Sequence, residues 1–128
     1  MVMNVGYASR NGNLCSAPGD RQGVDGDALD ALRAFPVPAR REAGFQLGLV
    51  QRGRDPDDWK PMNTVGRGVR EIRIRDDGGA FRVLYVAKFE EAVFVLHCFQ
   101  KSQKTSRADL DLATRRYKEL RKELRHEQ

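Results

Sequence analysis

The chain is poor in the residues that build disulfide frameworks and metal sites. Its 128 residues include two cysteines, Cys15 and Cys98, and two histidines, and no cysteine pair has CxxC spacing. Two distant cysteines form no disulfide framework, so a reducing cytoplasm is the expected location. His97 and Cys98 are adjacent in a predicted strand, where successive side chains diverge, which argues against zinc. The sequence therefore predicts neither a metal nor a cofactor.

Long apolar runs and familiar catalytic motifs are also missing. No uninterrupted apolar run is long enough to span a bilayer, and the N-terminus lacks the basic and then apolar pattern of a secretory signal. There is no internal repeat, no phosphate-binding P-loop and no serine nucleophile elbow. We expect a soluble, intracellular protein without a membrane partner.

The composition is that of an ordinary globular protein with an excess of positive charge. Hydrophobic residues make up 40% of the chain and charged residues 32%, and the net charge is +5. A basic balance favours nucleic acid or another polyanion as the partner. Residues 1–25, rich in Gly, Asn, Ser and Asp, are predicted to be an N-terminal extension, with a short strand at Met3 to Ala8 as an alternative. Residues 26–128 are predicted to form one domain.

Three strands joined by two tight turns organise this domain. β-branched and aromatic residues predict strands over Val69 to Arg75, Phe81 to Phe89 and Ala92 to Phe99. The residues from Asp76 to Gly79 predict the first turn, because glycine adopts positive φ without strain. Glu90 and Glu91 are the expected second turn.

Side-chain alternation then predicts two different sheet faces, provided that both turns have an even number of residues. One face would be a cationic surface: Arg73, Arg75, Arg82, His97, Phe99 and Lys101. The other would be the core face, covered by helices: Ile72, Ile74, Phe81, Val83, Tyr85, Phe94, Leu96 and Cys98. Like charges opposite one another destabilise a sheet, so an arginine cluster points to an anionic ligand.

Helices are predicted on both sides of these strands in the sequence. A short helix with Leu29, Leu32 and Phe35 ends at Pro36, and a second begins at Pro38 and ends at Gly53. The second helix has its apolar stripe at Ala39, Ala43, Leu47 and Val50, widened by Phe45 and Leu49. A C-terminal helix opens at Ser106, with Asp109 completing a capping box, and its stripe is Leu110, Ala113, Tyr117, Leu120 and Leu124.

The segment between the second helix and the strands contains Trp59 and a Gly66-Arg67-Gly68 triplet. We interpret Trp59 as a packing residue rather than a base-stacking platform. The triplet precedes a strand, whereas a dinucleotide fingerprint precedes a helix. It is better explained as a flexible loop that holds Arg67 outward.

His97 is the candidate for acid–base chemistry. Neighbouring arginines would lower its pKa and a bound phosphate would restore it, so that it titrates near neutral pH. RNA can be cleaved through its own 2′-OH if a protein positions the phosphate, moves two protons and stabilises the charge, and this route needs no metal. The predicted cationic face supplies these residue types. Glu71 is a second candidate base, with a salt bridge to an arginine as the alternative.

The motifs resemble those of a known family. The blocks VREIRIRD, FRVLYVAKF and LHCFQKSQKT, together with GDALDALRAFP, resemble toxins of the RelE/ParE superfamily, in its phage-related HigB-like branch. The resemblance covers about Gly26 to Leu120. It implies a RelE-like α+β fold with two N-terminal helices, an antiparallel sheet of three to four strands and a C-terminal helix.

The resemblance also implies a function. It indicates the toxin of a type II toxin–antitoxin pair, which enters the ribosome and cleaves mRNA. The partner would be a helix-turn-helix antitoxin that neutralises the toxin, in a complex that binds operator DNA. By position, the catalytic residues would be His97, Arg73, Arg75 and Arg82. The RNA-binding residues would be Lys60, Arg67, Lys101 and Lys104.

Two other functions remain open at this point. Related ParE toxins inhibit DNA gyrase, and a basic RNA-binding module without catalysis would have the same charge. Mutation of His97 separates these from a ribonuclease, because only catalysis should fall sharply.

Overall fold

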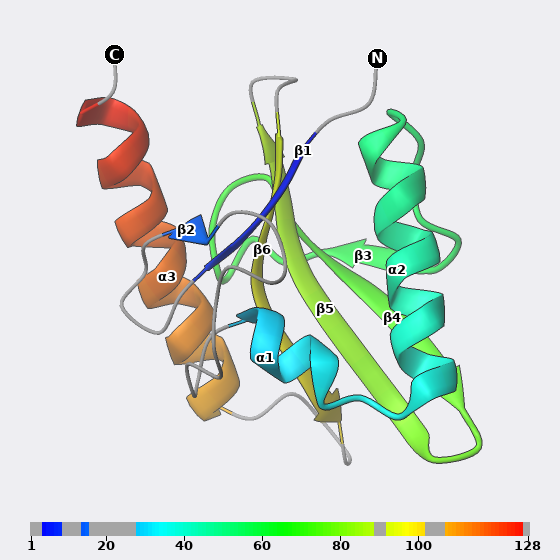
Figure 1. Cartoon of the computed structure of the whole chain (residues 1–128). Coiled ribbons are helices and arrows are strands. Elements are labelled where there is room, and N and C mark those ends of the chain that lie inside the picture. Colours follow the sequence, from blue (N-terminus) through cyan, green and yellow to red (C-terminus); the bar gives the residue numbers. More distant parts are fainter. Residues whose placement is uncertain (1–3, 9–13, 16–27, 89–91, 102–106, 127–128) are drawn as a thin grey trace.

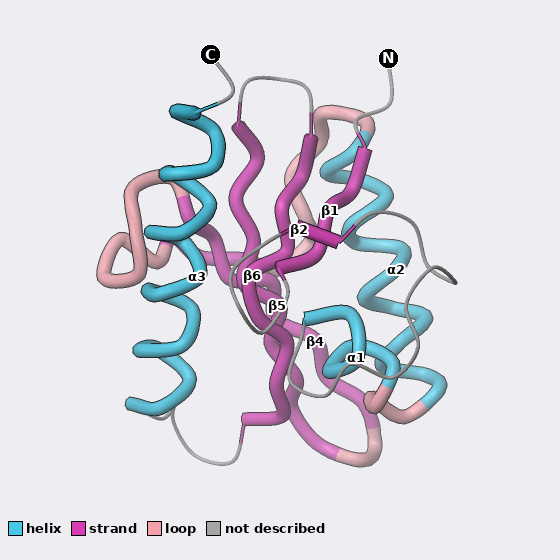
Figure 2. Tube along the Cα trace, turned by 60° about the vertical axis from the view of Figure 1, so that its left-hand side comes forward, coloured by secondary structure: helices cyan, strands magenta, loops and turns pink. Residues whose placement is uncertain are grey.

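The computed structural model describes residues 4–8, 14–15, 28–88, 92–101 and 107–126. In chain order the elements are β1 (Asn4–Ala8), β2 (Leu14–Cys15), α1 (Ala28–Arg33), α2 (Val37–Gln51), β3 (Trp59–Pro61), β4 (Val69–Asp76), β5 (Gly79–Lys88), β6 (Ala92–Lys101) and α3 (Arg107–His126). A central sheet lies between α1 and α2 on one side and α3 on the other (Figures 1 and 2). The predicted α+β class is confirmed.

The sheet is larger than predicted and is mixed. In the described part of the chain its six strands have the order β2-β1-β6-β5-β4-β3, and β1 runs parallel to β6 while the other pairs are antiparallel. The predicted antiparallel sheet of three to four strands corresponds to β3, β4, β5 and β6, and β1 and β2 extend it beyond the prediction. The alternative strand near residues 3–8 is present as β1. Two and three residues are too few for alternation to reveal β2 and β3.

The first hairpin has the geometry that its sequence predicts. Asp76 pairs with Gly79, so Asp77 and Gly78 form a two-residue loop. The Asp76 carboxylate accepts a hydrogen bond of 2.7 Å from the Gly78 N–H, and Gly79 has φ +137°. A residue with a Cβ is strained at such an angle, which explains the glycine. The second predicted turn, Glu90-Glu91, lies outside the described residues.

A β-bulge changes the faces of the second hairpin. Lys88 pairs with Ala92, which leaves three connecting residues, and the register shifts between Leu84 and Tyr85. Beyond the bulge, Leu84 pairs with His97, so the predicted parity holds from there to Lys101. On the N-terminal side of the bulge in β6 the two faces are exchanged relative to the prediction. Phe94 and Leu96 therefore lie on the face opposite to the predicted one. A bulge adds one residue to one strand and so exchanges the faces.

Each sheet face carries its own apolar core. On one face α1 and α2 pack on Ile72, Ile74, Phe81, Val83, Tyr85 and Cys98. On the other, α3 packs through Ala113, Tyr117 and Leu120 on Val69, Leu84, Val86, Phe94, Leu96 and Phe99. The second face is therefore an open cationic surface only where α3 does not cover it.

The helices mostly follow their predicted stripes. In α2, Ala39, Ala43, Leu47 and Val50 are buried as predicted, but Phe45 is 54% exposed and does not widen the stripe. Gly53, with φ +80°, follows the end of α2. In α3, Ser106 and the side chain of Leu124 lie outside the described part. No helix in the described ranges is both long and apolar enough to cross a membrane.

Candidate functional site

The alternation of β4 brings most of the predicted basic residues together. Glu71, Arg73 and Arg75 share one face of this strand, Lys60 of β3 lies opposite Glu71, and Arg82 of β5 lies opposite Arg73. We call this group the cationic cluster. It lies on the same sheet face as α3, toward the β3 edge.

A single carboxylate lies at the centre of the cationic cluster. Glu71 Oε1 is 3.5 Å from Arg82 Nε, 3.8 Å from Arg73 Nε and 3.8 Å from Lys60 Nζ. The Glu71 side chain is fully buried, and that of Arg82 is 6% exposed. The side chains of Arg73 and Lys60 are 34% and 42% exposed. The cluster thus has a buried base and a solvent-facing rim of donors.

The rim is tied to the segment before β3. The Arg73 N–H donates to the Asp58 carbonyl over 2.8 Å, and Arg73 Nη1 is 4.0 Å from Asp58 Oδ1. Arg75 is exposed at the end of the cluster. Four cations face two carboxylates, so the cluster keeps net positive charge for an anionic ligand.

Arg82 is more deeply buried than the other arginines of the cluster. Its Nη1 donates to the Phe81 carbonyl at 3.0 Å. Burial is the main cause that lowers the pKa of Arg82; Glu71 opposes this effect, and Arg73 and Arg75 add to it. A buried guanidinium has already lost most of its water, so a bound anion would interact with it strongly.

His97 has different neighbours from those predicted. It pairs with Leu84 on β6 beneath α3, where its Nε2 is 2.7 Å from Asp109 Oδ1 and its Nδ1 is 3.5 Å from Arg116 Nη1. Its ring stacks on Phe99 with 5.1 Å between centroids. The residue is 8% exposed. Its catalytic role stays a prediction.

The pKa of His97 is lowered, as expected, but for another reason. Burial is the largest cause, Arg116 adds to it, and the Asp109 carboxylate opposes both. The arginines of the cationic cluster are not among the causes, so the cation that acts on this imidazole comes from α3. The sheet alone could not predict this, because the neighbours of a strand residue include the helix packed over it.

The other predicted RNA-binding residues are dispersed. Arg67 is exposed, as predicted, but its loop is tied to α3, because the Tyr117 hydroxyl donates to the Arg67 carbonyl at 2.8 Å. Lys101 pairs with Ala80 and is half-buried on the Arg75 side of the sheet. Lys104 lies outside the described residues.

Trp59 is half-buried and lies under the Arg70 guanidinium, 4.1 Å from its ring centroid. One face of this ring is therefore covered by the protein itself. This agrees with a packing role rather than with an open platform for stacking bases.

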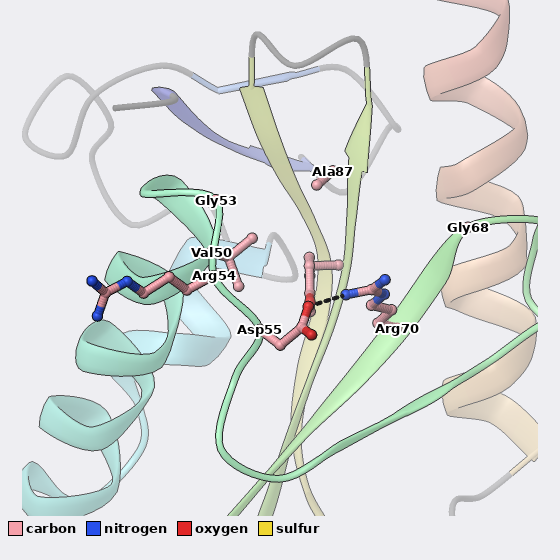
Figure 3. A pocket seen from close by; sticks show the side chains of 8 residues that line it. Val50, Gly53, Arg54, Asp55, Gly68, Arg70 and Ala87 are labelled. Carbon is pink, nitrogen blue, oxygen red and sulfur yellow. Dashed lines mark hydrogen bonds and ion pairs between the residues drawn. The ribbon is translucent and has the colours of Figure 1, made fainter. Parts of the chain in front are cut away.

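A cavity of about 350 Å³ lies on the opposite sheet face, between the end of α2 and strands β4 and β5 (Figure 3). Arg70 and Asp55 are paired there at 3.0 Å, and the Arg54 side chain points away from them. The buried Tyr85 also lines the cavity, and burial raises its pKa. Because its facing charges neutralise each other, this cavity suits a phosphate less well than the cationic cluster does.

Two residues of the site were missed in the sequence. Asp58 contacts Arg73 from the position directly before β3, a strand that was itself too short to predict. Arg116 is 1% exposed, and its Nη1 donates to the Leu96 carbonyl at 2.8 Å. The spacing of Ala113 and Leu120 places Arg116 on the buried side of α3, so this signal was present in the sequence.

The fold and the cluster define a small α+β protein with a cationic sheet face. Among the residues described, no three His, Cys, Asp or Glu side chains are grouped so that they could hold a metal ion. The charged and titratable side chains on this face are those of arginine, lysine, histidine and carboxylates, of which Glu71 is fully buried.

Residues 30–118 match the family described as phage derived protein Gp49-like (DUF891). This match covers more than half of the chain, and the protein belongs to the Gp49-like family. The family is one of RelE/HigB-like toxins in general, which makes this a phage-derived, toxin-like protein. A comparison with curated proteins gives no match.

Proposed function

We propose that this protein is the toxin of a type II toxin–antitoxin pair and that it cleaves mRNA on the ribosome. The observation that carries the proposal is the cationic cluster: two arginines directly opposite each other on β4 and β5, flanked by Lys60 and Arg75. Like charges opposite each other are unfavourable in a sheet, and the single Glu71 carboxylate beside them offsets only part of the positive charge, which favours an anionic ligand. A phosphodiester of single-stranded mRNA has the required charge and geometry.

In this proposal the cluster binds the scissile phosphate and stabilises the charge that develops on it. The adjacent 2′-OH loses its proton and attacks the phosphorus, the P–O5′ bond breaks, and the 5′-oxygen leaves with a proton while a 2′,3′-cyclic phosphate remains. The protein thus supplies positioning, charge and proton transfer. Arg73 and Arg82 would contact the phosphate, and Lys60 and Arg75 the neighbouring backbone. A helix-turn-helix antitoxin would neutralise the protein, and the complex would bind operator DNA.

His97 is the point on which the alternative depends. Its Nε2 faces Asp109 under the first turns of α3, so proton transfer through it requires Asp109 to release it. This favours a second candidate function, a non-catalytic toxin of the gyrase-inhibiting kind or a basic RNA-binding module. In that case the cluster would bind a polyanion without cleaving it.

Primer extension on a defined mRNA with programmed ribosomes distinguishes the two. The ribonuclease proposal predicts cuts in the A-site codon that are lost in Arg82→Ala and reduced in Arg73→Ala. Arg54→Ala, an exposed arginine on the opposite sheet face, is the control and should cut normally. The absence of cuts with folded wild-type protein would favour the binding function. Loss of cutting with retained RNA binding in His97→Ala would assign proton transfer to that residue.

A further inference from the structure

Glu71 is costly to the fold. It is fully buried, and within the described residues neither of its oxygens meets a hydrogen-bond partner. Its three cations approach at 3.5 to 3.8 Å, which is the range of ion pairs rather than of hydrogen bonds. Removing a carboxylate from water costs several kcal/mol, on the order of what a close ion pair returns. A buried polar group without a hydrogen bond requires an explanation.

Stability does not provide that explanation. Buried ion pairs can often be replaced by apolar side chains of similar volume without loss of stability. Leu84, the residue opposite Glu71 on β5, is apolar and buried, so an apolar neighbour at position 71 would suit the surroundings. The carboxylate must therefore be considered for its effect on the arginines beside it.

The contacts of Glu71 use one particular edge of each guanidinium. Oε1 contacts the Nε atoms of Arg73 and Arg82, at 3.8 and 3.5 Å. A guanidinium presents five N–H donors in a fixed plane. The carboxylate attracts the Nε end of both guanidiniums, which leaves their Nη groups as the donors for other partners. One of them, Arg82 Nη1, is used by the Phe81 carbonyl.

This arrangement also keeps two like charges close together. Arg73 and Arg82 are a direct cross-strand pair, and without a counter-charge they would separate into solvent. Glu71, two residues before Arg73 on the same face of β4, provides that counter-charge. The two guanidiniums can then act on the same ligand.

We propose that Glu71 is a positioning residue that holds Arg73 and Arg82 so that their Nη groups converge on one phosphodiester of single-stranded RNA. The inference rests on the proposed function for its substrate and on the described geometry for the role of Glu71. It makes Glu71 an organiser of the phosphate site and not the base that removes the 2′-OH proton. A fully buried carboxylate surrounded by cations has no open path to that proton.

Glu71→Gln is the direct test, because it keeps the shape and removes the charge. On programmed ribosomes we expect kcat to fall by about 10- to 100-fold, since a misplacement on the order of 1 Å has that effect. KM should not rise, because the cluster becomes more positive. Binding of a non-cleavable RNA with a 2′-deoxy cleavage-site nucleotide should be unchanged or tighter. Wild-type kcat in this variant would overturn the inference.

Two matched variants complete the experiment. Asp55→Asn removes an exposed carboxylate outside the cluster, paired with Arg70 at 3.0 Å on the opposite sheet face, so its effect on kcat should be less than about threefold. Glu71→Asp keeps the charge and withdraws it by one methylene, so it should also be slow; wild-type kcat there would contradict positioning. This variant serves if Glu71→Gln does not fold.

Two readouts separate positioning from other roles. The pH profile of kcat should keep its shape in Glu71→Gln, and loss of its acidic limb would identify Glu71 as a base and overturn the inference. The Nε–H NMR signals of Arg73 and Arg82 should both shift in this variant, without any substrate. If wild-type protein cleaves nothing, the proposed function fails, while unchanged Nε–H signals would reject the role of Glu71 independently.

Discussion

Among the glycines whose surroundings the structure describes, Gly66 is the one at which an added methyl group would meet the closest contact. A Cβ there would lie 2.6 Å from Tyr117 Cζ, well inside contact distance. Tyr117 is 4% exposed and its hydroxyl is bonded to the Arg67 carbonyl, so the ring cannot move away freely. Gly66→Ala must therefore displace either α3 or the loop before β4.

The expected cost follows from these contacts. Overpacking of this kind costs about 1–3 kcal/mol. If the ring yields and its hydrogen bond is lost, a further ~1 kcal/mol is added. We expect Gly66→Ala to lower the free energy of unfolding by about 2–4 kcal/mol, measured by urea denaturation with a folded-state check by circular dichroism.

Gly44→Ala is the matched control. Gly44 lies within α2, where a Cβ meets nothing within 4 Å, so alanine should stabilise the helix by about 0.5–1 kcal/mol. Gly66→Ala should also cost less in a Tyr117→Leu background, because the ring is then absent. A neutral Gly66→Ala, or equal effects in both backgrounds, would refute the packing described for α3.

Three further predictions concern separate parts of the molecule. Burial raises the pKa of Cys98 to about 12, so iodoacetamide at pH 8 should leave its peptide unmodified in native protein and label it in urea; rapid native labelling would contradict its burial. Because the pKa of folded His97 is below 6.5, its contribution to stability is complete above pH 6.5 and declines as the pH falls below that value. His97→Gln should reduce this decline in urea midpoints between pH 7.5 and 5.5, and an unchanged slope would assign it to other groups. Gln46 joins α2 to Asp57 through bonds of 2.8 and 2.9 Å, so Gln46→Ala should cost about 1–3 kcal/mol and speed hydrogen exchange of the Asp57 amide. Unchanged exchange there would show that other contacts hold this segment.

Local patterns predicted the central strands and the helices well. β4, β5 and β6 are rich in β-branched and aromatic residues, and Gly78 and Gly79 indicate a tight turn between β4 and β5. The apolar stripe of α2 predicted the buried residues of this helix, because side chains recur along a helix with a fixed period and α2 packs on one surface, the sheet. The prediction that Phe45 widens this stripe was wrong, because an apolar residue at the margin of a stripe can face solvent.

The two cores could not be predicted from alternation alone. The bulge between Leu84 and Tyr85 moves Phe94 and Leu96 to the α3 face, and a bulge leaves little trace in a strand that is apolar on both faces. The parallel partner of β6 is distant in sequence, so the pairing of β1 depends on tertiary packing.

The sequence predicted that the arginines of the candidate site lie together, but it did not predict the neighbours of His97. Arg73, Arg75 and Arg82 are neighbours because strand parity and a two-residue turn determine their pairing. His97 obeys the same parity, yet its chemistry depends on Asp109 and Arg116, which reach it from α3. Alternation predicts faces, and only the docking of the helix determines what lies over them.

The chemistry of the cut end tests the central claim most directly. Wild-type protein, programmed ribosomes and an mRNA with a single 2′-deoxy nucleotide at the cleavage site should give no cut, whereas the all-ribose mRNA should give a 2′,3′-cyclic phosphate. Arg82→Ala should abolish this cleavage and Arg54→Ala should retain it. Cleavage of the deoxy mRNA, or full activity of Arg82→Ala, would contradict phosphate binding and 2′-OH attack at the cationic cluster.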